Sequence, residues 1–163
     1  NAWTRQRKAL DKKEKEIYTR DCGMKIDLLN LNWTYRAKKD YHMLPPDIYL
    51  MTIPIHYRIK VDEFKALVEA PTVDQFMQLL ANTYYENRFH AMQRSEGMEQ
   101  FYKACIHGMY LSDRRRNPYS LATVNTYLFL KEEEINRLTT ALECIRYGLT
   151  PRETLGYIGG AKK

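Results

Sequence analysis

Histidine and cysteine are the side chains of this sequence whose spacing would be most diagnostic of a metal site. No two histidines are four residues apart, the spacing that places two imidazoles on one face of a helix. The cysteines form no Cys-x-x-Cys pair and fit no disulfide framework, which indicates a reducing, cytosolic setting. The residues concerned are His42, His56, His90, His107, Cys22, Cys105 and Cys144. We expect no metal site.

The glycines do not form a phosphate-binding loop. Gly159 and Gly160 are adjacent, but neither a Lys-Ser or Lys-Thr pair nor a helix follows them. A serine or cysteine nucleophile would need a histidine that only the fold could bring close, and no local signature indicates one. We therefore expect no catalytic residues, no cofactor and no ATP binding by this chain alone.

Short basic clusters are the remaining chemical feature. The candidate partner-contact residues are Arg36, Lys38, Lys39, Arg114, Arg115 and Arg116. Trp33, Tyr35 and Tyr41 surround the first cluster, and interleaved aromatics of this kind stack on bases in single-stranded nucleic-acid sites. We favour the alternative that the aromatics are core and the bases are solvated. The second cluster also stands where cations stabilise the C-terminal end of a helix dipole.

Composition limits the class of protein without choosing its partner. A chain of 163 residues can remove roughly 70% of its unfolded surface from water, so it should fold. The net charge is +6, but 26 basic and 20 acidic residues are interspersed, which suits nucleic acid, an acidic protein or an anionic membrane about equally. We find no leader and no apolar run of about 18 residues, so any membrane contact is expected to be peripheral. Because the chain lacks an initiating Met, we treat it as a piece of a longer protein.

Apolar residues recur at spacings of three and four, which predicts an all-α fold. We expect a helix over residues 4–21 that stops at Gly23, then a helix from an Asp27 cap to about Tyr41. Pro46 should open a short helix through Leu50. Residues 53–59 alternate briefly, but Pro54 favours a loop.

Two more short helices and one long helical stretch follow. Residues 61–69 should point Phe64, Leu67 and Val68 inward. Thr72 and Gln75 have capping-box spacing for the next helix. Its predicted inward residues are Phe76, Leu79 and Leu80. The stretch 85–116 reads as helical with interruptions at Gly97 and Gly108, before Asn117-Pro118 ends it.

Ser120 is a good N-cap for what we predict to be the longest helix. Apolar residues along it keep alternating spacings of three and four, interrupted only by Lys131, and predict a buried seam. The seam residues are Leu121, Val124, Leu128, Ile135, Leu138, Leu142 and Ile145. Leu128→Asp should then cost several kcal/mol. Gly148 should end this helix, and Thr150-Pro151 should start a short one through Tyr157.

Two segments match at a constant offset. The pairs are Leu29 with Ile135, Asn30 with Asn136, Tyr41 with Tyr147, Pro45 with Pro151 and Asp47 with Glu153. Each segment is a long helix, a turn and a Pro-started short helix with an acid in its first turn. We read two related helical lobes, residues 1–83 and residues 84–163 packed on the first, although this pattern also recurs by chance in α-proteins.

A family resemblance rests on two blocks. Residues 25–39 carry Asp27-Leu28-Leu29-Asn30-Leu31 and then Arg36-Ala37-Lys38, which resembles the Asp-x-x-Asn-Leu helix and Arg-x-Lys of the C subunit of V/A-type ATPases, called d in eukaryotes. Residues 117–120, 127–138 and 145–151 are similar to that family's closing block. Arg137 departs from the closing block, because the family usually has a leucine directly after the asparagine that stands here as Asn136.

The resemblance implies a non-catalytic coupling subunit. Family members are longer, funnel-shaped and built of related helical lobes, so this chain would be roughly the C-terminal half. It would join the central shaft subunit to the membrane rotor ring, as a peripheral protein on the cytoplasmic face, for ATP-driven ion transport or ATP synthesis. In this reading Asp27 is a helix cap, and Asn30 and Asn136 are buried or turn-binding amides.

Two rival functions remain. The main alternative is a basic helical nucleic-acid-binding module that uses Arg36, Lys38 and Lys39, and it requires affinity that falls steeply with salt. A small helical enzyme would need a pocket of convergent polar groups, for which the sequence offers no candidate. Under the coupling interpretation we expect no nucleic-acid partner.

Overall fold

The computed structural model describes residues 2–86 and 98–158, and all regular structure within these ranges is helical. The all-α prediction is therefore confirmed. In chain order the helices are α1 (Ala2–Ala9), α2 (Lys12–Lys39), α3 (Pro45–Met51), α4 (Val61–Glu69), α5 (Val73–Leu80), α7 (Met98–Arg116), α8 (Leu121–Arg146) and α9 (Pro151–Tyr157). His90, Gly97 and the tail 159–163 lie outside the described residues.

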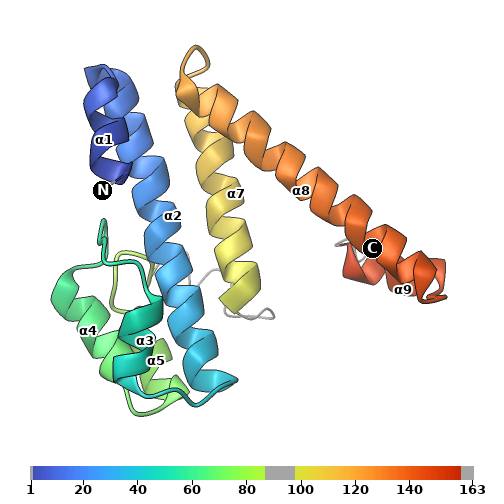
Figure 1. The fold of residues 1–163 in the computed structure, drawn as a ribbon, viewed down its shortest axis with the longest axis horizontal. Helices are drawn as coiled ribbons and strands as arrows, with labels where there is room; N and C mark the ends of the chain where they lie inside the picture. Colours follow the sequence, from blue (N-terminus) through green and yellow to red (C-terminus); the bar gives the residue numbers. More distant parts are fainter. Residues whose placement is uncertain (1, 87–97, 159–163) are drawn as a thin grey trace.

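Helix α2 is the axis of the molecule (Figure 1). The short helices α3, α4 and α5 gather against its C-terminal half, and α7 runs antiparallel along another side. Helix α8 starts beside the end of α7 and diverges from the body, with α9 folded back at its far end. The chain thus forms a packed body with one projecting helix.

Gly23 does not stop a helix, so the predicted break there is wrong. Helix α2 begins after Asp11, whose carboxylate accepts the N–H of Glu14 at 2.8 Å, and it continues through Gly23 to Lys39. A Cβ on Gly23 would lie 2.5 Å from Cγ of Tyr57. The glycine therefore lets the Tyr57 ring approach the helix backbone closely.

Asp27 is also not a helix cap, and this prediction is wrong. It lies in the middle of α2, where its carboxylate accepts the backbone N–H groups of Tyr57 at 3.0 Å, Arg58 at 2.7 Å and Ile59 at 3.2 Å. Burial raises the pKa of Asp27, and these hydrogen bonds oppose the rise. The loop that leads into α4 is thus held by a buried carboxylate.

Asn30 behaves as predicted and Asn136 does not. The Asn30 side-chain amide donates to the Ile53 carbonyl at 2.8 Å and accepts the Ile53 N–H at 2.9 Å. Asn136 is exposed on α8, so its predicted role as a buried or turn-binding amide is wrong. Residues 53–59 form the predicted loop, and Asn30 and Asp27 hold its two ends.

The core lies between α2, the short helices and α7. Phe64, Leu67 and Val68 of α4 are buried as predicted. In α5 the Thr72 side chain accepts the Gln75 N–H at 3.2 Å, which confirms that cap. The predicted inward residues of α5 are right for Phe76 and Leu80 and wrong for Leu79, which is 37% exposed.

Helix α7 continues through Gly108, so the predicted interruption there is wrong. A Cβ on Gly108 would meet nothing within 4 Å. One glycine in a helix interior costs about 1 kcal/mol relative to alanine, which is too little to end a helix that packs along α2 and α8.

The ends of α8 and α9 follow the predicted capping chemistry. Ser120 caps α8, and Gly148 adopts a φ of +72° just beyond its last turn. Thr150 and Glu153 form a reciprocal capping box at the start of α9. The length prediction is wrong, however, because α2 has 28 residues and α8 has 26.

The predicted seam of α8 is not buried in this chain. Six of its residues are between 52% and 67% exposed, and these are Val124, Leu128, Ile135, Leu138, Leu142 and Ile145. Helix α8 instead attaches to the body through its opposite face. Ala122 and Thr126 are fully buried there, and the Phe129 ring stacks on Tyr110 with centroids 4.8 Å apart.

The internal repeat remains a prediction. Both α2–α3 and α8–α9 consist of a long helix, a turn and a short helix started by proline. Their surroundings differ, since α2 contributes ten buried residues and α8 contributes three among the described side chains.

Candidate partner-binding surfaces

A buried ionic cluster joins α2 to α7, and no local sequence pattern predicts it. Arg20 of α2 binds Asp113 of α7 through two contacts, Nε to Oδ2 at 2.9 Å and Nη2 to Oδ1 at 2.8 Å. Asp21 lies beside this pair, with its Oδ1 at 3.7 Å from Arg20 Nε. Asp21 and Asp113 are 1% and 3% exposed. An acidic residue in a charged stretch of sequence is normally predicted to be solvent-exposed. Only the fold shows that Asp21 and Asp113 are buried together.

The cluster holds a proton near neutral pH. Burial and the neighbouring Asp113 together raise the pKa of Asp21 to about 8, against the smaller lowering effect of Arg20. Two carboxyl groups beside one guanidinium carry one charge too many for a dry site, so one of them keeps its proton. The arrangement fastens α2 to α7 and does not resemble an exposed acid–base pair.

The first basic cluster lies at the C-terminal end of α2, and its members have different surroundings. Arg36 is exposed and its Nε lies 3.8 Å from Asp40 Oδ2. Lys38 donates to the carbonyls of Val68 at 2.6 Å and Ala70 at 2.7 Å, at the C-terminal end of α4. Lys39 is exposed, with its Nζ 5.3 Å from the centroid of the Tyr35 ring.

Lys38 thus has a structural contact that the sequence did not indicate. Its ammonium satisfies carbonyls that a helix end leaves without partners, and partial burial lowers its pKa. Of the three residues in this cluster, Arg36 and Lys39 present exposed charge.

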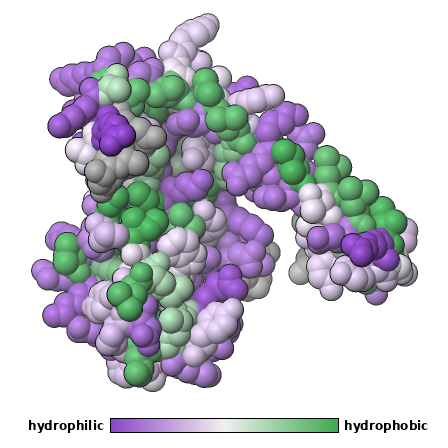
Figure 2. Space-filling view, viewed as in Figure 1, coloured by the Kyte–Doolittle hydropathy of each residue, from purple (hydrophilic) through white to green (hydrophobic). Residues whose placement is uncertain are grey.

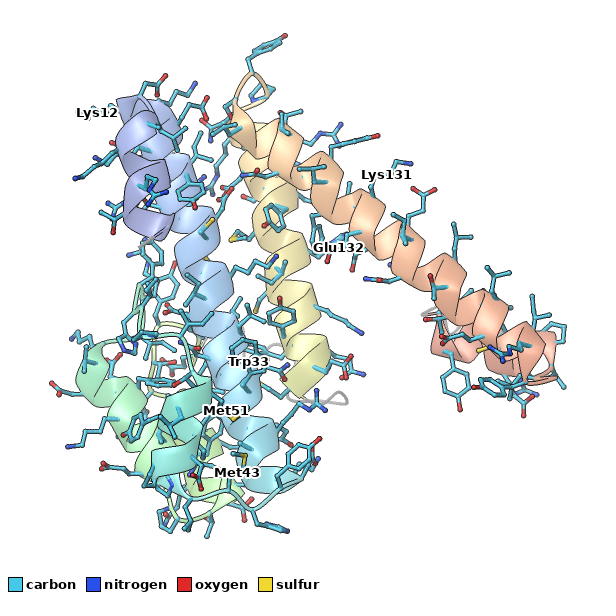
Figure 3. All side chains as sticks on the ribbon, viewed as in Figure 1. Lys12, Trp33, Met43, Met51, Lys131 and Glu132 are labelled. Atoms are coloured by element: carbon cyan, nitrogen blue, oxygen red, sulfur yellow. The ribbon has the colours of Figure 1, made fainter. Side chains whose placement is uncertain are left out.

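A hollow beside Arg36 gathers aromatic and methionine side chains. It is lined by Trp33, Arg36, Ala37, Tyr41, Met43 and Met51. Figure 3 labels Trp33 on α2 and places Met43 and Met51 near the short helix α3. Tyr41 is 65% exposed, so the prediction that the aromatics around this cluster are core is wrong for Tyr41. The end of α2 therefore offers both charge and apolar surface.

The second basic cluster lies at the other end of the body. Arg114, Arg115 and Arg116 form the last turn of α7 and are all exposed. Because α7 runs antiparallel to α2, as the Arg20–Asp113 pair requires, these arginines lie at the end of the body opposite Arg36 and Lys39. The two clusters do not form one basic face.

Helix α8 carries an exposed apolar surface. Figure 2 shows hydrophobic side chains following the projecting helix away from the body. Leu155 and Tyr157 of α9 are 54% and 69% exposed near its end. In an aqueous setting such a surface marks a contact with another molecule more often than a free face.

No group of three or more His, Cys, Asp or Glu side chains that could hold a metal ion occurs within residues 2–86 and 98–158. Over the same ranges, none of the helices has the length and apolar character needed to cross a lipid bilayer.

The chain matches a known protein family over almost its whole length. A family model described as ATP synthase (C/AC39) subunit matches residues 1–157. The chain belongs to the ATP synthase C/AC39 subunit family. No curated protein and no solved structure matched it in the same comparisons. The resemblance seen in residues 25–39 and 117–151 is thereby confirmed, and the C/AC39 match places the chain in an ATPase assembly.

Proposed function

We propose that this C/AC39 chain is a non-catalytic central-stalk subunit that couples the central shaft to the membrane rotor ring during ATP-driven ion transport or ATP synthesis. In this role it lies at the cytoplasmic face of the membrane as a peripheral protein. The observation that carries the proposal is the family match over residues 1–157, joined to a helical body with an exposed basic cluster at each end.

A coupling subunit has to hold two partners at separate places. Arg36 and Lys39 lie at one end of the α2–α7 pair, and Arg114 to Arg116 lie at the other. Exposed charges at these positions suit polar loops of a ring, acidic patches of a shaft or lipid headgroups.

Coupling also requires a body that transmits torque without yielding. Close packing gives protein interiors low compressibility, and here the α2 core is reinforced by polar contacts that span long stretches of sequence. Asp27 and Asn30 hold the 53–59 loop, while Arg20 and Asp113 join α2 to α7. The division into lobes 1–83 and 84–163, as the C-terminal half of a longer funnel, is part of the same proposal.

The nucleic-acid alternative receives no support from the arrangement of charge. A single-stranded nucleic-acid site needs a continuous basic groove with aromatic platforms, whereas the two clusters lie at opposite ends of the body. Lys38, one of the three bases that this alternative requires, donates to the carbonyls of Val68 and Ala70.

Charge reversal at each end tests the proposal. We would prepare Arg36→Glu with Lys39→Glu, and separately Arg114→Glu, Arg115→Glu and Arg116→Glu together. Each variant is used to capture purified shaft subunit and detergent-solubilised rotor ring. We expect each variant to lose one of the two partners at least tenfold while it keeps the other.

Lys65→Glu on α4 is the control, because it reverses an exposed charge that belongs to neither cluster. It should capture both partners as the parent does. Lys38 is left unchanged in these variants, since its loss would also remove contacts that hold the end of α4. The proposal is contradicted if the parent chain captures neither shaft nor ring, or if neither variant weakens capture.

A further inference from the structure

The exposed apolar row of α8 has the register of a coiled coil. Leu121, Leu128, Ile135 and Leu142 recur every seven residues, and Val124, Lys131, Leu138 and Ile145 follow each of them by three. These are the a and d positions of consecutive heptads. A seven-residue repeat matches a second helix wound left-handedly around the first, so the shape that this row fits is another α-helix.

We call these eight residues the α8 seam, and it faces away from the contacts that α8 makes with the α2–α7 body. Those contacts use Ala122, Thr126 and Phe129, which lie on the other side of the helix. Beyond Leu121, which is half-buried, the apolar seam residues are all more than half exposed in the part of the chain that the structure describes. The seam is therefore open to a partner while α8 stays attached to the body.

The charges on and beside the seam restrict which helix can cover it. Lys131 occupies a d position in the middle, and its Nζ binds Glu134 Oε2 at 2.6 Å. Glu132 and Glu134 flank the seam at the e and g positions, which set partner choice in coiled coils. In Figure 3 Lys131 points away from the body and Glu132 points toward the side of α7. The centre of the seam is thus acidic on both flanks with one cation in its core.

These charges disfavour a second copy of α8 in either orientation. A parallel pair would place two Lys131 ammonium groups in the same core layer. An antiparallel pair, in which each a residue meets a d residue, would bring Glu132 against its counterpart in the second copy and Glu134 against its own. Like charges at these positions destabilise the pairing, so the seam selects a helix of different sequence.

We propose that the α8 seam binds an amphipathic helix of a partner protein, with apolar residues at its a and d positions, basic residues at the flanking positions opposite Glu132 and Glu134, and an acidic residue opposite Lys131. This inference rests on α8 alone and does not depend on the proposed function.

Two synthetic helices test the inference. Both are four heptads long with leucine at a and d; one has lysine on its flanks and a glutamate facing Lys131, and the other has the opposite charges. Binding of each labelled peptide to the 163-residue chain is followed by fluorescence anisotropy at low and at high salt. We expect the basic peptide to bind at least tenfold more tightly, with a preference that shrinks as salt increases.

Variants of the chain separate the seam from other surfaces. Leu128→Asp with Ile135→Asp should abolish binding, whereas Asn136→Asp, on another face of α8, should leave it unchanged. Glu132→Lys with Glu134→Lys should reverse the preference, so that the acidic peptide binds more tightly. Circular dichroism melting of each variant shows whether it is folded.

Three results would overturn the inference. Equal binding of both peptides would show that the flanking charges do not select, and binding that survives the two aspartates would place the site elsewhere. A concentration-dependent dimer of the chain in sedimentation, lost in the Leu128→Asp, Ile135→Asp variant, would make a second copy the occupant of the seam.

Discussion

At the scale of single residues, a few buried polar side chains fix the path of one loop and the pairing of two helices. Asp27 and Asn30 bind the backbone of the 53–59 loop, and Arg20 joins Asp113 across the α2–α7 interface. Each satisfies groups that would otherwise be buried without a partner, a loss that costs about 1–3 kcal/mol per group. Apolar packing alone would leave this loop without a defined path.

The Asp21 carboxyl predicts a pH dependence of stability. Its pKa in the folded chain is raised from 3.8 to about 8. The contribution of Asp21 to the free energy of unfolding is therefore fully present below about pH 4 and is lost as the pH rises toward 8. Asp21→Asn removes this titration while it keeps a neutral side chain of the same size. Between about pH 4 and 8 the parent should lose stability relative to the variant as pH rises, by roughly 1 kcal/mol per pH unit, measured by urea unfolding.

Asp74→Asn, at an exposed position of α5, is the matched control for this experiment. Its pH profile should follow the parent. If Asp21→Asn follows the parent profile too, the raised pKa of Asp21 is refuted.

At the scale of helices, two glycines in the interiors of long helices should respond in opposite ways to substitution by alanine. Gly23 in α2 lies under the Tyr57 ring, whereas Gly108 in α7 has open space where a Cβ would stand. Gly23→Ala should destabilise the chain by about 1–3 kcal/mol through overpacking. Gly108→Ala should stabilise it by about 0.5–1 kcal/mol through helix propensity. Thermal unfolding of both variants checks the pair, and changes of the same sign would contradict it.

Because Leu28 on α2 is buried and Leu128 on α8 is exposed, truncating each leucine should have a different effect on stability. Leu28 is 1% exposed in the core, and Leu28→Ala should cost about 2–5 kcal/mol. Leu128 is 59% exposed, so Leu128→Ala should change stability by less than about 0.5 kcal/mol. For the same reason the several kcal/mol predicted for Leu128→Asp should not appear in the isolated chain. A large loss of stability in the urea midpoint of either Leu128 variant would show that its face is covered in solution.

At the scale of the whole molecule, periodicity and capping chemistry were enough to predict the all-α class, most helix ends, and the core faces of α4 and, apart from Leu79, of α5. The neighbours that each side chain meets in the folded chain could not be predicted in the same way. Asp27 has the residue type of a helix cap, and only the fold brings the 57–59 backbone to it. The α8 seam has the pattern of a buried stripe, but a pattern records that a face is apolar and not which molecule covers it.

The basic clusters show the same limit. The sequence is enough to identify the residues of the two basic clusters. Their separation to opposite ends of the body follows from the antiparallel arrangement of α2 and α7. The Arg20–Asp113 pair that enforces this arrangement spans 93 positions, beyond the reach of local patterns.

Helix α8 is attached to the body near one end only, so it can act as a lever. A 26-residue helix is roughly 39 Å long, and it is attached near one end through Ala122, Thr126 and Phe129. A sideways pull at the far tip therefore acts on these few contacts with a large moment arm. Conversely, a slight rotation at the root, near the Arg20–Asp113 pair, would move α9 through a much wider arc.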